Sequence, residues 1–438
     1  MELTTESLER WRRAIRDDVN GRYLLSMAVA IRFQGGGALA LPWLEKAHRE
    51  AGSHQDAAAF ALSQVLSEVG EEARAIRISH DAVARNPDHE LAALRDLGAF
   101  YLDTPVVPES ARTDLLTRAF RMARERGNLA ATGETGARLA VQHARLGRFD
   151  DARDVLQALD GLTGATPETV ALLLELLATA ADERDLWCAA ARALITLMPA
   201  DASEEIPTLH RVASKADTMN QPAIMVMALE RILAIAPRDV PARLRLAQNR
   251  AIEGDEAAAI ALLMEMVSGG DVATLVALSN ILFLAGRAEE ADRYSAENLS
   301  RHPDAIAVIQ QRGVLLIAMG RHQEAVTLLR PVTDMWPSNP SLGSTLALAL
   351  HHLGHSEDAL KHMPLPQSVS TADRSWVPWY LCVRGVIQDA AGRSDDATRS
   401  FTEAARIATL EKLRFHLRLR PTIADAAMQR LQGVGFAI

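Results

Sequence analysis

The stretch MGRHQEAVTLLRPVTDMWPSNP, residues 319–340, decides the fold of this 438-residue chain. It holds Gly320, the small residue Ala325 five positions later, an apolar run, and Pro337 seventeen positions after the glycine. Pro331 stands inside the run, where we expect it to kink a helix or end it early. A local bend is the simpler interpretation of Pro331, and a change of curvature at this point is the functional one.

The same pattern recurs along the chain, so the stretch is one unit of a repeating structure. Glycines at 286, 320, 354 and 392 are spaced by 34, 34 and 38 residues, and earlier copies centre on Gly70, Gly147 and Gly254. Asp182 and Asn220 replace the glycine in two units. A small residue stands seven positions before every turn except one, where Glu175 stands, as expected where two helices cross closely.

A period of 34 residues with two short helices per unit resembles the tetratricopeptide repeat family. The resemblance covers nearly the whole chain and is strongest from Arg250 to Ile407. It implies an all-α fold, an α-solenoid superhelix of about eleven helical hairpins, each burying its apolar stripe against the next. We expect an N-terminal capping segment over 1–20, the superhelix over 21–407 (most regular over 250–407), and a basic segment with a capping helix, Pro421–Gly433, over 408–438.

Composition agrees with this expectation and limits the function. Hydrophobic residues make up 48% of the chain and aromatic residues only 4%, which favours helix packed on helix. The net charge of −9 offers no general attraction to nucleic acid, and the apolar segment 23–31 is shorter than the roughly 20 residues that span a membrane. Two distant cysteines and an arginine-rich, lysine-poor composition favour a cytoplasmic, bacterial protein.

The sequence contains no motif of a known catalytic or nucleotide site. We therefore expect no enzyme activity, no cofactor and no metal. His351 and His355 have the spacing of two ligands on one helical face, but Gly354 between them is expected to end the helix. Surface histidines, or a patch sensitive to pH, are the two interpretations of this histidine-rich region.

The first helix of each hairpin lines the inner groove of such a superhelix, and this register predicts the residues that bind a partner. The chaperone-binding members of the family hold a C-terminal carboxylate with lysines, an arginine and asparagines, and only Asn280 matches that set. The mixed polar, aromatic and acidic groove favours a peptide or a partner helix. The predicted groove residues are Arg32, Phe60, Gln64, His210, Asp217, Gln248, Asn280, Phe283, Gln310, His351, Trp379, Cys382 and Asp389.

Two segments near the C-terminus leave alternatives open. The insertion 364–378 ends near Trp376, Trp379 and Tyr380, which either bind a partner or begin the next helix and pack inside. KLRFHLRLR (412–420) alternates basic and apolar residues, which is typical of a strand, whereas the preceding sequence favours a continuing helix. Its basic residues, Lys412, Arg414, Arg418 and Arg420, form a candidate site for an acidic ligand or partner.

Together these features predict a non-catalytic scaffold or adaptor that binds a partner protein or peptide in its concave groove. The alternative is an accessory or sensor subunit of a biosynthetic or envelope-polysaccharide enzyme, which binds a small or acidic ligand near the basic segment. The sequence does not distinguish a monomer from a homo-oligomer.

Overall fold

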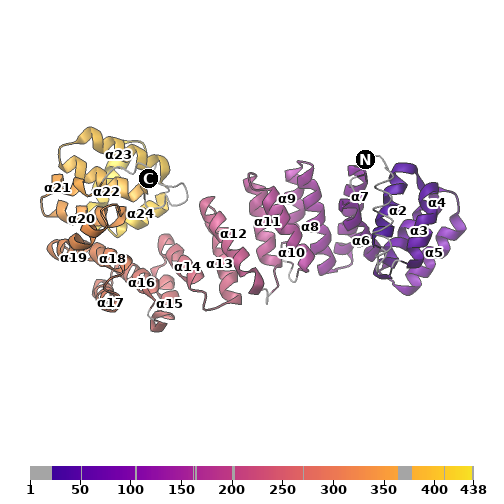
Figure 1. The fold of residues 1–438 in the computed structure, drawn as a ribbon, viewed down its shortest axis with the longest axis horizontal. Helices are drawn as coiled ribbons and strands as arrows, with labels where there is room; N and C mark the ends of the chain where they lie inside the picture. Colours follow the sequence, from indigo (N-terminus) through magenta and orange to yellow (C-terminus); the bar gives the residue numbers. More distant parts are fainter. Residues whose placement is uncertain are drawn as a thin grey trace. The chain divides into compact units, whose positions relative to one another are not determined.

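A computed structural model describes residues 22–50, 52–103, 106–160, 162, 165–199, 203–269, 271–363, 377–408 and 410–436. Over these residues the secondary structure is helical, and no strand occurs among them. The chain divides into two compact units, unit 1 (Met1–Ile235) and unit 2 (Ala236–Ile438). In each unit, successive helices pair as antiparallel hairpins (Figure 1).

The described residues of unit 1 form six hairpins and two short 3-10 helices, η1 (Gly52–His54) and η2 (Ser203–Glu205). The paired helices are α2 (Arg22–Gly35) and α3 (Gly37–Glu50), α4 (Gln55–Glu68) and α5 (Glu72–Arg85), α6 (His89–Asp103) and α7 (Glu109–Glu125), α8 (Leu129–Arg145) and α9 (Phe149–Gln157), α10 (Pro167–Thr179) and α11 (Arg184–Leu197), and α12 (Ile206–Thr218) and α13 (Pro222–Ile235).

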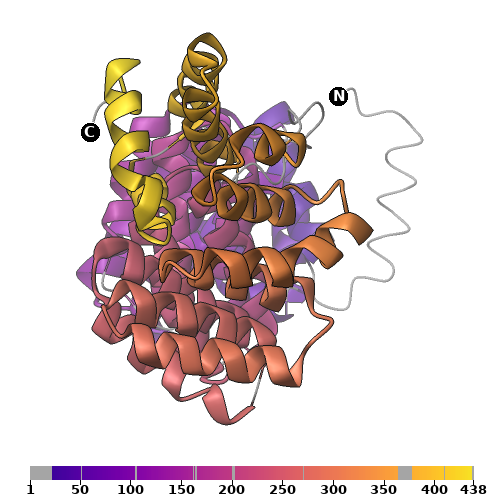
Figure 2. The same ribbon diagram turned by 90° about the vertical axis from the view of Figure 1, so that its left-hand side faces the viewer.

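The described residues of unit 2 form five hairpins and the 3-10 helix η3 (Val267–Gly269). Further helices, yellow in Figure 2, follow at its C-terminal end. The paired helices are α14 (Val240–Glu253) and α15 (Glu256–Met264), α16 (Val272–Leu284) and α17 (Ala288–Arg301), α18 (Ile306–Ala318) and α19 (His322–Met335), α20 (Pro340–His352) and α21 (Ser356–Lys361), and α22 (Val377–Ala390) and α23 (Ser394–Ile407). The last two helices are α24 (Leu410–Arg418) and α25 (Pro421–Gly433).

The eleven predicted hairpins are thus confirmed, and so are their glycine turns. Each of the seven glycines named above has a positive φ, the left-handed conformation that ends the first helix of a hairpin. Asn220 takes the same conformation, with φ 54°, at a turn that lacks glycine. Asparagine tolerates this region better than other side chains because its amide bonds locally to the backbone.

The small residues seven positions before the turns lie where helices cross. Ala28, Ala140, Ala213, Ala247 and Ala347 are completely buried. At Gly313 an added Cβ would come within 2.7 Å of Leu329 on the paired helix, so any larger residue would force that side chain to shift. The apolar stripes of successive hairpins form shared clusters, over α2–α7 in unit 1 and over α14–α25 in unit 2, and such burial is the main source of stability in a repeat array.

Ion pairs also link neighbouring hairpins across the surface. Arg145 Nη2 lies 2.7 Å from Glu175 Oε1, and Arg393 Nη2 lies 2.6 Å from Glu357 Oε2. Exposed pairs of this kind contribute about 0–1 kcal/mol each, so apolar burial determines the stacking. Helix α19 continues through the exposed Pro331 to Met335, so the proline does not end it early.

Candidate functional site

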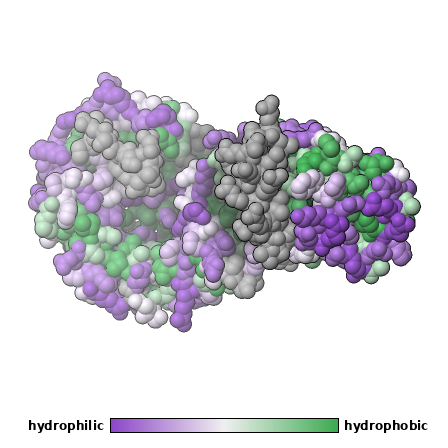
Figure 3. Space-filling model, turned by 45° about the vertical axis from the view of Figure 1, so that its right-hand side comes forward, coloured by the Kyte–Doolittle hydropathy of each residue, from purple (hydrophilic) through white to green (hydrophobic). Residues whose placement is uncertain are grey.

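An open groove of about 650 Å³ lies on unit 1, between helices α2, α4 and α5. It forms because α6, the first helix of the next hairpin, packs mainly against α4 and leaves much of α5 uncovered. Figure 3 shows hydrophobic (green) surface beside hydrophilic (purple) surface at this end of the chain. The groove is lined by Arg32, Ser63, Gln64, Ser67, Glu68, Glu72, Ala75, Ile76, Ser79, His80 and Val83.

One side of the groove is polar and is held in place by Arg32. Its Nη1 donates to Gln64 Oε1 at 3.0 Å, and its Nη2 pairs with the Glu68 carboxylate. Because the guanidinium is engaged by both groups, the three side chains form one network across α2 and α4. Arg32 and Gln64 are two of the predicted groove residues, and the structure brings them together.

The other side of the groove comes from α5 and carries two exposed apolar side chains. Ile76 and Val83 are 61% and 48% exposed, and they lie seven residues apart, on one face of the helix. Two turns of helix separate them by about 10 Å. Ser79 and His80 stand between them on the same face. The groove therefore presents two apolar side chains beside a hydrogen-bonding network.

The remaining predicted residues of unit 1 do not line this groove. Phe60 is half-buried on α4, and the Arg118 guanidinium carbon lies 5.7 Å from the centre of its ring. His210 and Asp217 are on α12, the first helix of the sixth hairpin, and both are half-buried.

In unit 2, the segment whose alternating pattern left strand and helix open is helical, as α24. Phe415 and Leu419 join the apolar cluster formed by α14, α16 and α18, whereas Leu413 and Leu417 join the cluster that contains Trp379 and α25. The chain's own C-terminal segment thus covers part of the surface formed by the first helices of this unit.

Several predicted groove residues of unit 2 have contacts within the chain. Gln310 Nε2 donates to Thr345 Oγ1 at 3.3 Å, and His351 Nδ1 lies 2.9 Å from Ser356 Oγ. Asp389 pairs with Arg430 of α25, with an Nε to Oδ2 distance of 2.7 Å. Phe283 packs against the α14–α16–α18 cluster, whereas Gln248 is exposed.

Trp379 and Cys382 are buried on α22. Trp376 lies outside the described residues, as does the insertion up to that position. The guanidinium carbon of Arg420 stands 4.0 Å from the centre of the Trp379 ring, a cation–π contact. Burial lowers the pKa of Arg420 to about 10 and raises that of the Cys382 thiol to about 12.

The other three basic residues of the tail differ in exposure. Arg418 Nη2 lies 2.6 Å from Glu256 Oε1, Arg414 is exposed, and Lys412 is half-buried. The tail therefore does not present its four positive charges on one open surface.

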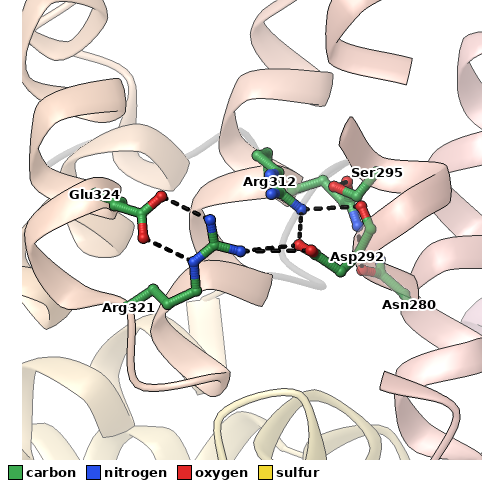
Figure 4. Close-up of polar contacts among 7 residues, drawn as sticks. Asn280, Asp292, Ser295, Arg312, Arg321 and Glu324 are labelled. Atoms are coloured by element: carbon green, nitrogen blue, oxygen red, sulfur yellow. Dashed lines mark hydrogen bonds and ion pairs between the residues drawn. The ribbon is translucent and has the colours of Figure 1, made fainter. Parts of the chain in front are cut away.

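A polar network between hairpins α16–α17 and α18–α19 was not found from the sequence (Figure 4). The Asp292 carboxylate pairs with the buried Arg312, and Arg321 Nη1 approaches the same carboxylate at 3.2 Å. Arg321 also holds Glu324 at 2.6 Å, and this hydrogen bond lowers the pKa of Glu324.

The predicted residue Asn280 is half-buried and belongs to a second set of hydrogen bonds beside this network (Figure 4). It accepts from Gln311 Nε2 at 3.2 Å, and Gln311 Oε1 accepts from Ser295 Oγ at 2.9 Å. These contacts join two hairpins, and no sequence signal marks them because their members come from four helices, α16 to α19, and from the turn before α19.

The histidine-rich region contains a stack of imidazoles. The rings of His322 and His352 are stacked at 4.7 Å, and His351 lies 5.2 Å from His352. Burial, followed by the two neighbouring imidazoles, lowers the pKa of His352 to about 4. Among the residues that the structure describes, no three histidine, cysteine or acidic side chains are arranged to hold a metal ion.

No described helix combines the length and apolar character needed to cross a bilayer. Neither a model of a known protein family nor a curated protein matches the sequence. Solved structures with a similar arrangement include the human IFIT1 dimer with PPP-AAAA, which is 13% identical, covers 95% of this chain and 90% of its own, and has a TM-score of 0.39.

Two other similar structures have comparable sequence identities, coverages and TM-scores. The Cut9–Hcn1 hetero-tetramer of the APC/C is 16% identical, with 96% of this chain and 88% of the other covered and a TM-score of 0.36. Yeast Tom70 is 12% identical, with 94% and 96% covered and a TM-score of 0.34. The repeat assignment rests on the helices and turns of this chain itself, which is an all-α array of tetratricopeptide-like hairpins.

Proposed function

We propose that this protein is a non-catalytic scaffold or adaptor that binds a segment of a partner protein in the groove of α2, α4 and α5. The observation that carries the proposal is the exposure of Ile76 and Val83 beside the Arg32 network. Exposed apolar side chains grouped within a polar rim are typical of interaction sites. Both cysteines are free thiols, which supports a place in the reducing cytoplasm.

The shape and charge of the groove favour one class of partner. Two apolar side chains about 10 Å apart match the spacing of apolar anchors at i and i+7 on an amphipathic helix. The groove is lined by two glutamates and a single arginine, so a basic residue on the partner finds a complementary charge. We therefore propose an amphipathic helix with apolar anchors and at least one lysine or arginine.

A direct test combines cross-linking with measured affinity. A photoreactive phenylalanine analogue placed at Ile76 in the full chain is used to capture partners from cells, and the captured protein is identified and purified. Its Kd is then measured for the wild type and for Ile76→Asp/Val83→Asp. Because the charged variants oppose apolar contact at the centre of the groove, we expect affinity to fall at least about 30-fold, or ~2 kcal/mol.

Leu129→Asp is the matched control, because Leu129 is also in unit 1 and is 53% exposed, but lies outside the groove. It should bind the partner as the wild type does. Equal affinities for the wild type, the double variant and the control would refute the assignment of this groove.

A further inference from the structure

Helix α24 has apolar residues at every second position, which is unusual for a helix. Two residues advance a helix by about 200°, so this alternation produces two apolar stripes on opposite sides. Leu413 and Leu417 form one stripe, and Phe415 and Leu419, which directly follows the helix, form the other. All four side chains are buried, with at most 6% exposed.

The two stripes contact different parts of unit 2. Phe415 and Leu419 lie on an apolar wall contributed by the first helices of three hairpins, α14, α16 and α18. We call this surface the inner wall; it comprises Ala247, Ala251, Leu278, Ile281, Leu282, Val314 and Leu315. Leu413 and Leu417 belong to the cluster of the last hairpins and α25.

Charge complements the apolar contact at the edge of the inner wall. Arg418 pairs with Glu256 at 2.6 Å and donates to the Leu284 carbonyl at 3.3 Å. The inner wall thus already binds a helix, through one of its two apolar stripes and through one basic side chain.

The hairpins do not depend on α24 for their own pairing. Each first helix of unit 2 packs against its own second helix and against the next first helix, and α24 is an addition from the C-terminal end of the chain. Ala408, between α23 and α24, has an extended backbone, so no continuous helix joins the two. Because α24 follows the last described hairpin and lies between the helices of none, it can leave the wall without separating any helix pair.

We propose that the inner wall is a second helix-binding site, with α24 as its resident occupant. Its external partner is a basic amphipathic helix with an aromatic or leucine pair at i and i+4. Such a partner competes with α24, so its apparent affinity is reduced by the fraction of molecules in which α24 is bound. This site is separate from the groove of unit 1, and its test does not depend on that groove.

The experiment uses the full chain and a fluorescent peptide with the sequence of residues 408–436. Phe415→Asp/Leu419→Asp removes the resident stripe from the wall but leaves the wall residues unchanged. We expect the peptide to bind this variant at least ~10-fold more tightly than it binds the wild type. Arg414→Asp is the matched control, because Arg414 is exposed on the same helix, and it should behave as the wild type.

The peptide itself supplies a second control. A peptide carrying the same two aspartates should not bind the double variant, and the normal peptide should protect the amides of α16 and α18 from hydrogen exchange. Equal binding to wild type and double variant would overturn the proposal. Absence of binding to a double variant with normal helical circular dichroism would do so too.

If the double variant loses its helical signal, Phe415→Ala and Leu419→Ala are tested singly against the same criterion. Loss of the fold in both single variants would show that α24 is an integral part of the core, and would also overturn the proposal. Ile76→Asp/Val83→Asp should leave peptide binding unchanged, which separates this result from the proposed function of unit 1.

Discussion

Replacing Gly385 by alanine tests the close helix crossing on which the repeat depends. Gly385 lies on α22 and faces Phe401 of the paired helix α23. An added Cβ would lie 2.6 Å from Phe401 Cε2 and 2.8 Å from Cζ, well inside the ~3.5 Å of normal carbon contact. The Phe401 ring is completely buried in the core, so any shift of the ring must displace its packed neighbours.

Two opposing terms determine the size of the effect. Overpacking a core by one methyl group costs about 1–3 kcal/mol. Alanine in a helix interior is more favourable than glycine by about 0.5–1 kcal/mol. The difference spans about 0–2.5 kcal/mol, and we expect Gly385→Ala to destabilise the α22–α23 hairpin by about 1 kcal/mol, or a factor of roughly 5 in its opening equilibrium.

Hydrogen exchange followed by mass spectrometry measures this change locally, which suits a chain of two units that need not unfold together. Protection of the α22 and α23 amides should fall by that factor. Gly133→Ala is the matched control: it is also a buried helical glycine, but its nearest neighbour, Thr169, would be 3.7 Å from the new Cβ. That variant should be as stable as the wild type or slightly more stable.

The double variant Gly385→Ala/Phe401→Leu tests whether contact with the Phe401 ring causes the destabilisation. If contact with the ring is responsible, the two substitutions should be less destabilising together than the sum of their separate effects. Protection in Gly385→Ala equal to or greater than that of the wild type would refute the steric reasoning, since alanine would then act there as it does at Gly133.

Three further predictions follow from the turns, the histidine stack and the thiols. Asn220→Ala should destabilise the α12–α13 hairpin by ~1 kcal/mol, because alanine is strained at φ 54°, whereas Asn220→Gly should change its hydrogen-exchange protection little. The pKa of His352 is about 4 in the folded protein and 6.5 in the unfolded chain, so the unfolded state binds more protons between these values. The melting temperature should therefore fall as the pH is lowered from 7 to 5, and His352→Gln should reduce that fall. Iodoacetamide at pH 8 should alkylate Cys382 only after denaturation, as measured by intact mass, because the thiol is buried and its pKa is raised to about 12; rapid alkylation of the native protein would contradict the described burial.

Local backbone chemistry explains why so much of the fold could be predicted from the sequence. Gly320 and its equivalents each end a helix by their own conformation, and the helix C-terminal to each begins within a few residues. The small residue seven positions before each turn indicates where the helices of that hairpin cross. Eleven hairpins and the helix Pro421–Gly433 follow from such signals, because each depends on residues close together in the chain.

The candidate sites were predictable only in part. The register placed Arg32 and Gln64 on the first helices of successive hairpins, and they share a hydrogen bond. The exposure of Ile76 and Val83 was not predictable, because it depends on how α6 packs against α4 and α5. Asp292 and Arg312 were missed for a similar reason, since an ion pair between hairpins has no fixed spacing in sequence.

The sequence by itself determined the repeating unit, the turns and the helical content of this protein, because these depend on backbone conformations that each short segment adopts. Only the tertiary structure decided that residues 410–418 form a helix and not a strand, and that Trp379 lies beneath Arg420. The alternating pattern of α24 suits a strand or a helix buried on two opposite sides. Which of them forms depends on the apolar surfaces available around it, and distant hairpins supply those surfaces.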